Sequence, residues 1–288
     1  MDYAVVVAIE VVYAIASLVL ISLGLAVIFG MMRVINLAHG EFMVMGSYSA
    51  TVAAHHNVDV WIAILVVPPL VVGAVGVLIE RVVIRYLYGR MVETMLATWG
   101  LSLFVVGALT MIFGSTTEGV PTPLGGVSIG RYQTSGYSLF VIAISLAAMA
   151  ATYVLLRRTR LGLLARGTMQ NAAMAAALGT DTSRVYAITF GFGAALAGLA
   201  GGVLAPISGV FPSIGGSYIG KAFITVIGGG ALPLAGTASA STLFGIVNQI
   251  ATFASNPVYG EVALLLAAIV LIRVLPQGIT GRYLRGYL

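Results

Sequence analysis

The sequence predicts an all-α membrane protein: a polytopic transmembrane helical bundle of about 8–10 spans, with one broken or re-entrant segment. Of its 288 residues, 60% are hydrophobic and only 8% are charged, and the mean hydropathy is +1.06. A soluble domain typically carries about 25% charged residues. The chain therefore has too little charge to cover a surface in water, and we expect one transmembrane domain over residues 1–288.

Apolar runs recur along the chain, most of them near the length of about 20 residues that spans a bilayer. The run Ile219–Ile227 is too short to span as a plain helix, and three glycines follow it. Irregular backbone at membrane depth survives only where protein buries it or water reaches it. The expected spans are Ala4–Phe29, Leu37–Ala54, Trp61–Val83, Thr94–Phe113, Tyr137–Leu156, Val185–Ala205, Ile219–Ile227, Leu234–Phe253 and Glu261–Val274.

The basic residues gather in alternate loops, which predicts the orientation. Loops rich in arginine stay in the cytoplasm, and the loops His55–Val60 and Gly114–Gly136 are poor in it. This pattern predicts a cytoplasmic C-terminus, and a count of nine spans would place the N-terminus outside. The arginines of the basic groups are Arg81, Arg85 and Arg90, then Arg157, Arg158, Arg160, Arg166 and Arg184, then Arg273, Arg282 and Arg285.

The stretch "RVINLAHGEFMVMGSY" from Arg33 places several polar residues beside a long apolar run. One interpretation is a broken helix in which Asn36, His39, Gly40 and Glu41 line or brace a polar path, as half-helices do in transporters. The other is a cytoplasmic turn in which Arg33 sets topology and Asn36 caps the next helix. A metal site at His39 and Glu41 has little support, because there are no cysteines and no further histidine nearby.

The loop 157–184 is the longest predicted cytoplasmic segment. Its Ala-rich stretch Gln170–Leu178 predicts a short helix, which Gly179 would end. Such a helix either docks a soluble partner or only connects two spans, and the residues leave both possibilities open.

The stretch Tyr218–Thr237 contains Lys221, the chain's single lysine, and the triple glycine. Lys221 either meets a substrate carboxylate or extends to the lipid headgroups. Gly228, Gly229 and Gly230 permit close helix packing or a hinge. Glu10 is expected near the outer headgroups unless it is functional, and Glu80 and Glu93 are expected to pair with nearby arginines.

Motifs that carry chemistry are missing from the sequence. It has no cysteine, no Gly-rich loop ending in Lys-Ser or Lys-Thr, and no serine elbow or zinc helix. The chain therefore does not look like an enzyme, and no cofactor is expected in it.

The segment "INLAHGEF", Ile35–Phe42, resembles the motif that follows the first span in permease subunits of ABC importers for branched-chain amino acids. The typical motif reads Ile-Asn-Phe-Ala-His-Gly-Glu-Phe, so Leu37 is a mild departure. The resemblance covers almost the whole chain. It also rests on "GLAVIFG" before the motif, on the spacing of Arg166, Gln170 and Gly179, and on "GKAF", "LAGT" and the "PQG" of Pro276–Gly278.

The resemblance implies a permease of a binding-protein-dependent ABC importer in the bacterial inner membrane. Its partners would be a second, different permease subunit, two cytoplasmic ATPases that hold ATP and Mg, and an extracytoplasmic substrate-binding protein. The segment Gln170–Leu178 would be the coupling helix on the ATPase. The coupling residues that the resemblance implies are Arg166, Gln170, Asn171, Met174 and Gly179.

The substrate and two remoter alternatives stay open. "MQNAAMAAALG" from Met169 and "VFPSIGGSYI" from Val210 resemble the branch that imports urea or short-chain amides, although Ala172 and Lys221 depart from that branch. A stand-alone secondary transporter would need intramembrane ionisable residues, for which Glu10, His39 and Glu41 are the candidates. A membrane enzyme or scaffold has no reactive group of residues to support it.

Overall fold

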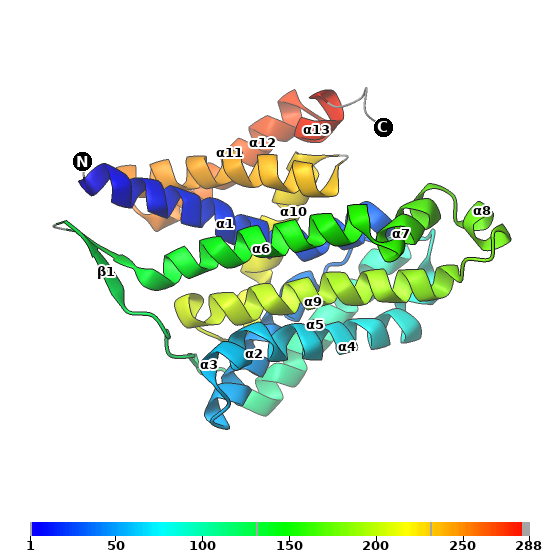
Figure 1. Ribbon diagram of the computed structural model, residues 1–288, viewed down its shortest axis with the longest axis horizontal. Helices are drawn as coiled ribbons and strands as arrows, with labels where there is room; N and C mark the ends of the chain where they lie inside the picture. Colours follow the sequence, from blue (N-terminus) through cyan, green and yellow to red (C-terminus); the bar gives the residue numbers. More distant parts are fainter. Residues whose placement is uncertain (1, 131, 231, 284–288) are drawn as a thin grey trace.

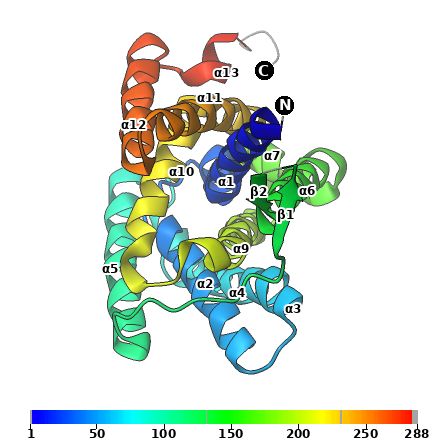
Figure 2. The same ribbon diagram turned by 90° about the vertical axis from the view of Figure 1, so that its left-hand side faces the viewer.

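The computed structural model describes residues 2–130, 132–230 and 232–283. Several of its helices run side by side along the long axis of the molecule (Figure 1), and others run across that axis (Figure 2). A β-hairpin lies at one end, and two short helices, α7 (Arg160–Gln170) and α8 (Ala172–Ala177), lie at the other. We call these the hairpin end and the α7–α8 end.

The described helices follow the predicted apolar runs closely. The first half of the chain forms α1 (Asp2–Met32), α2 (His39–His55), α3 (Val60–Leu65), α4 (Val67–Val82), η1 (Ile84–Leu87) and α5 (Met91–Phe113). The second half forms α6 (Gly136–Arg158), α7, α8, α9 (Thr182–Ser208), η2 (Pro212–Ile214), α10 (Gly215–Gly229), α11 (Pro233–Ala254), α12 (Pro257–Val274) and α13 (Gly278–Tyr283).

The number of spans is lower than expected. Six helical segments of the described residues are long and apolar enough to cross a membrane, or seven if a bent pair counts as one span. The expectation of about 8–10 spans is too high by this measure, because α2 has 17 residues and α10 has 15. The expected break is present: Pro212–Gly229 and Pro233–Ala254 form the bent pair, at an angle of 112°.

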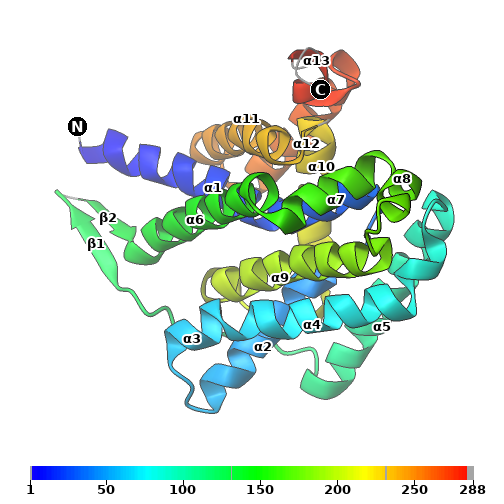
Figure 3. The same cartoon turned by 45° about the vertical axis from the view of Figure 1, so that its right-hand side comes forward.

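Helix α9 is the centre of the bundle. In its most apolar 18-residue stretch 72% of the residues are buried, against 17% for α5. It packs on α1, α2 and α4, and Figure 3 shows it between α6 and the pair α2 and α4. Its sequence "GFGAALAGLAGG" has small residues on every side, and small residues let membrane helices approach closely.

The crossing of α9 and α2 brings two backbones together. A Cβ atom on Gly201 would lie 3.0 Å from the Cα of Met43, and one on Gly46 would lie 2.7 Å from the Cα of Gly198. The Ser47 hydroxyl donates to the Gly201 carbonyl at 2.9 Å across the same crossing. This contact fixes α2 against the core without any ionic group.

A two-stranded antiparallel sheet extends from the hairpin end (Figure 2). Strands β1 (Gly126–Ile129) and β2 (Tyr132–Ser135) pair Gly126 with Ser135. The sequence predicted only a loop here. The Thr134 hydroxyl donates to the Glu10 carboxylate at 3.2 Å, which ties the hairpin to α1.

We predict that Gly201→Ala destabilises the protein by about 1–3 kcal/mol, since the new methyl group would press on the α2 backbone. Gly107→Ala on α5 is the matched control, because its Cβ would meet nothing within 4 Å. Thermal unfolding in detergent measures both. Equal midpoints for the two variants would contradict the role given to the α2–α9 crossing.

Candidate functional site

The chain unwinds between α1 and α2, at residues 33–38. Arg33 adopts φ = 53°, in the left-handed region that non-glycine residues seldom occupy. The Asn36 side-chain oxygen accepts from the Ala38 amide at 3.1 Å, so Asn36 supports the start of α2. Asn36 is fully buried. Arg33, at the start of the segment, is exposed. This junction is thus a stretch of irregular backbone that runs from an exposed arginine into the buried core, and both interpretations of it stay open.

Thr98 of α5 holds this junction from the side. Its hydroxyl accepts from the Leu37 amide at 3.1 Å, and its single proton is within hydrogen-bond distance of the Met95 carbonyl at 3.0 Å and the Ile35 carbonyl at 3.2 Å. The bond to Leu37 satisfies a backbone group that no helix pairs, as buried irregular backbone requires. Thr98 could not be predicted as a site residue from the sequence, because a threonine in an apolar run gives no signal of its own.

His39 begins α2 and is fully buried against α1. Its Nε2 lies 2.8 Å from the Ile21 carbonyl, and a carbonyl only accepts, so Nε2 carries the proton. Ile21 lies well inside α1, so α2 begins partway along α1 and not at its end. Gly24 leaves room for the ring, since a Cβ there would lie 3.1 Å from His39 Cε1.

Glu41 faces another helix, α10. If Gly215, the first residue of α10, carried a Cβ atom, that atom would lie 2.9 Å from Glu41 Oε1. A Cβ atom on Gly40 would likewise lie 3.1 Å from the Cα of Gly215. A carboxylate is favourable at a helix N-terminus, where free amides and the helix dipole are positive. Glu41 is 3% exposed. His39 and Glu41 therefore brace α2 against two different helices.

Three buried polar atoms of this junction have no partner among the described residues: Asn36 Nδ2, His39 Nδ1 and Glu41 Oε2. Buried groups of this kind are normally bonded to protein or to ordered water. No group of three or more His, Cys, Asp or Glu side chains comes together in the described part of the chain.

The segment Arg160–Ala177 forms two helices with a break between them. The predicted helix Gln170–Leu178 is wrong at its start: Gln170 ends α7, and Asn171 caps α8 by accepting from the Met174 amide at 2.9 Å. Gly179, with φ = 85°, ends the helix as expected. Met174 is 57% exposed and Leu178 is 79% exposed, so α8 presents an apolar surface.

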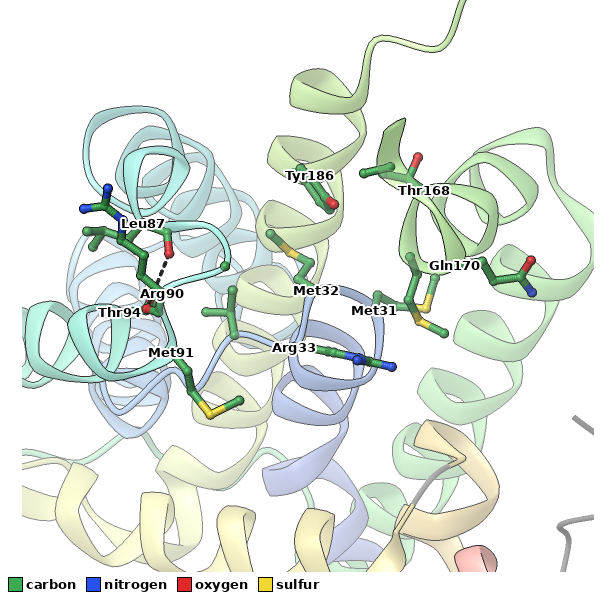
Figure 4. Close-up of a pocket in the computed structure, with 14 residues that line it drawn as sticks. Met31, Met32, Arg33, Leu87, Arg90, Met91, Thr94, Thr168, Gln170 and Tyr186 are labelled. Carbon is green, nitrogen blue, oxygen red and sulfur yellow. Dashed lines mark hydrogen bonds between the residues drawn. The ribbon is translucent and has the colours of Figure 1, made fainter. Parts of the chain in front are cut away.

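A cavity of about 380 Å³ connects α7 and α8 to the junction (Figure 4). It lies at the α7–α8 end, between the end of α1 and the starts of α5 and α9. Gln170 lies on its α7 side, whereas Arg166 does not line it. The polar residues that line the cavity are Arg33, Arg90, Thr94, Thr168, Gln170 and Tyr186.

Glu80 is paired in a way that the sequence did not suggest. It is fully buried and accepts from the Tyr88 hydroxyl, not from an arginine. Burial raises the pKa of the Tyr88 hydroxyl, and the contact with Glu80 raises it further, so the hydroxyl stays protonated and donates. The Tyr88 ring lies 4.6 Å from that of Tyr186, which lines the cavity.

The triple glycine permits close packing. Cβ atoms on Gly228, Gly229 and Gly230 would each lie within 3.1 Å of a neighbouring helix: of Leu271 in α12, Gly236 in α11 and Gly278 in α13. The Thr280 hydroxyl of α13 donates to the Gly229 carbonyl at 2.6 Å. The "PQG" segment therefore closes the end of α10.

Lys221 forms an ion pair with Glu261 of α12, at 2.6 Å between Nζ and Oε1. Neither expectation for Lys221 included this partner. Both side chains remain partly open, with 28% and 47% of their surface exposed. The only other ion pair among the described residues, Asp181–Arg184, lies on the surface.

Comparison with known proteins identifies the family. The family described as "Branched-chain amino acid transport system / permease component" matches residues 7–275. The chain belongs to this family. The predicted resemblance is thereby confirmed, and the molecule is a transport subunit that crosses the membrane several times.

Relatives of this permease cover nearly the whole chain. It is 29% identical over 279 residues to the high-affinity branched-chain amino acid transport system permease protein LivH of Escherichia coli (strain K12), with 91% of each chain covered. It is 29% identical over 280 residues to the corresponding protein BraD of Pseudomonas aeruginosa, again with 91% of each covered. A probable LivH of Methanocaldococcus jannaschii is 29% identical over 283 residues, covering 92% and 88%.

We predict that His39→Ala destabilises this permease by about 1–3 kcal/mol, because α2 loses its buried hydrogen bond to α1. His56→Ala is the control, since that side chain is exposed just beyond α2. The shift in the thermal unfolding midpoint in detergent is the measurement. A loss of similar size at His56 would mean that the His39 bond has no special weight.

Proposed function

We propose that this chain is the permease subunit of a binding-protein-dependent ABC importer that moves branched-chain amino acids across the inner membrane. The family match over residues 7–275 is the observation that carries the proposal. The relatives described above are all named for branched-chain amino acids. The urea or amide alternative gains no support from them.

The two ends of the bundle suit two kinds of partner. The α7–α8 end carries the arginine-rich loops, which by the positive-inside rule belong in the cytoplasm, and the C-terminus then lies there too. The hairpin end carries Asp59 and Glu118. In this orientation the hairpin end meets the extracytoplasmic binding protein, and α7 and α8 meet the ATPases.

The coupling role is assigned to α8 and its surroundings. The exposed side chains of Met174 and Leu178 give a soluble ATPase an apolar surface to bind. The chain has no P-loop of its own, so ATP hydrolysis belongs to separate subunits. Helix α8 contacts α7, and α7 contacts α1, so a movement of α8 would reach the permease body through these packed helices.

The broken junction and the triple glycine are assigned to the permease body. Asn36, His39, Gly40 and Glu41 hold α2 between α1 and α10. Gly228, Gly229 and Gly230 hold α10 against α11, α12 and α13. These residues thus position α10 from both of its ends, and we propose that α10 lines the substrate path.

The test is uptake of labelled leucine and labelled urea by vesicles that contain the whole complex and its binding protein. We expect leucine uptake that requires internal ATP, and no urea uptake. ATP-dependent uptake of urea alone would move the chain to the amide branch. Uptake driven by an ion gradient without ATP would overturn the importer assignment.

The proposed docking surface of α8 and its C-cap residue, which includes Met174 and Leu178, can be tested by substitution. Leu178→Asp should leave the fold intact, because this side chain is 79% exposed, and should lower ATP-driven leucine uptake at least tenfold. Co-purification of the ATPase with the permease reports the docking itself. Leu178→Met keeps an apolar contact and serves as the control. Unchanged uptake with Leu178→Asp would remove α8 from the coupling surface.

A further inference from the structure

The first half of helix α10 leaves a face of small residues uncovered, whereas Ile227 near its end is 47% exposed. Gly216, Ser217 and Gly220 are exposed, as is Ser213 one turn earlier. A Cβ on Gly216 or Gly220 would meet nothing within 4 Å. Figure 2 shows α10 beside α12, on the side of the bundle that also holds α5.

The neighbouring helix α12 has a very different outer face. Its exposed residues Leu265, Leu266, Ile269 and Val270 are all large and apolar, as a surface in contact with lipid should be. Glycine and serine offer lipid little apolar surface. This part of α10 therefore fits contact with water or with another helix better than it fits contact with lipid.

An ion pair borders this face. Lys221 follows Gly220 directly, and its ammonium lies 2.6 Å from the carboxylate of Glu261. Charged side chains within membrane helices are expensive in lipid, and they usually face a water-filled cavity or each other. This pair is closed on itself, and both side chains are partly exposed at the surface of the chain.

The pair lies near the hairpin end of the bundle. Glu261 is the fifth residue of α12, which begins at Pro257, so it lies roughly one helical turn, about 6 Å, inside the helix. Helix α11, which leads into α12, begins at Pro233 against Gly30 near the end of α1, and Gly245 packs on Ile15 nearer the start of α1. A substrate released at the hairpin end would reach this pair early.

We propose that Lys221 and Glu261 together form a contact for the two charges of a zwitterionic amino acid in the substrate path. The Lys221 ammonium would bind the substrate carboxylate, and the Glu261 carboxylate would bind the substrate ammonium. This proposal rests on the importer function proposed above and deepens it. It assigns recognition of the zwitterion to two residues of the membrane subunit.

The chemistry of the pair suits passage through the membrane subunit. When no substrate is present, the two charges satisfy each other, so neither is left unpaired in an apolar region. A zwitterion offers one replacement for each partner at once. Urea and simple amides carry no charge and offer neither, so the pair favours amino acids over neutral amides.

The experiment measures ATP-driven leucine uptake by vesicles containing the whole complex, with the binding protein saturated by leucine. The main variant, Lys221→Gln with Glu261→Gln, removes both charges and so leaves no unpaired charge. We expect uptake to fall at least tenfold, while stimulation of the ATPase by the loaded binding protein stays within twofold. The matched control is Glu93→Gln, an exposed carboxyl near the start of α5.

A structural clamp between α10 and α12 is the competing role. The exchanged pair, Lys221→Glu with Glu261→Lys, keeps the attraction but presents the charges to the substrate in reverse order. We expect it to assemble normally and still to transport leucine at least tenfold more slowly. Uptake within twofold of the unsubstituted complex, in either double variant, would overturn the proposal.

The two proposals fail in different ways. If the unsubstituted complex shows no ATP-dependent leucine uptake, the importer function itself fails. If that complex transports leucine and the double variants do so equally well, only the role of Lys221 and Glu261 fails.

Discussion

The architecture depends on the close approach of α9 to its neighbours. Lipid tails are as apolar as leucine, so helices gain no hydrophobic free energy by leaving lipid for one another, and tight packing must hold them together. Gly198 and Gly201 let the backbone of α9 reach that of α2, and Ser47 adds a hydrogen bond there. With α2 held in this position, its first residues lie against the interior of α1 and the start of α10.

That placement explains why a cluster of polar residues is tolerated in so apolar a chain. Asn36 starts α2, His39 donates to α1, and Glu41 lies at the positive end of α10. Asn36 and His39 thus bond to backbone groups at a helix start and at a helix crossing, and Glu41 lies beside a helix start. A side chain also bonds to backbone groups at the other end of α10, where the Thr280 hydroxyl accepts from the Leu232 amide and donates to the Gly229 carbonyl.

Much of the fold could be predicted from hydropathy, and much of the site could not. The apolar runs gave the helices within a few residues, and Gly228 to Gly230 marked the bend. The span count was too high because a run such as Leu37–Ala54 looks like a span, although α2 starts only at His39 and has 17 residues. The Glu261 partner of Lys221 lies 40 residues away, and only the fold brings such positions together.

The sparse packing of α5 has a mechanical consequence. Most of this helix is exposed, yet the Thr98 hydroxyl lies within hydrogen-bond distance of the backbone on both sides of Asn36. A tilt of α5 as a rigid rod would therefore pull on the residues that start α2, while the core around α9 stayed in place. Thr98 therefore couples the position of α5, a sparsely packed outer helix, to the buried segment that precedes α2.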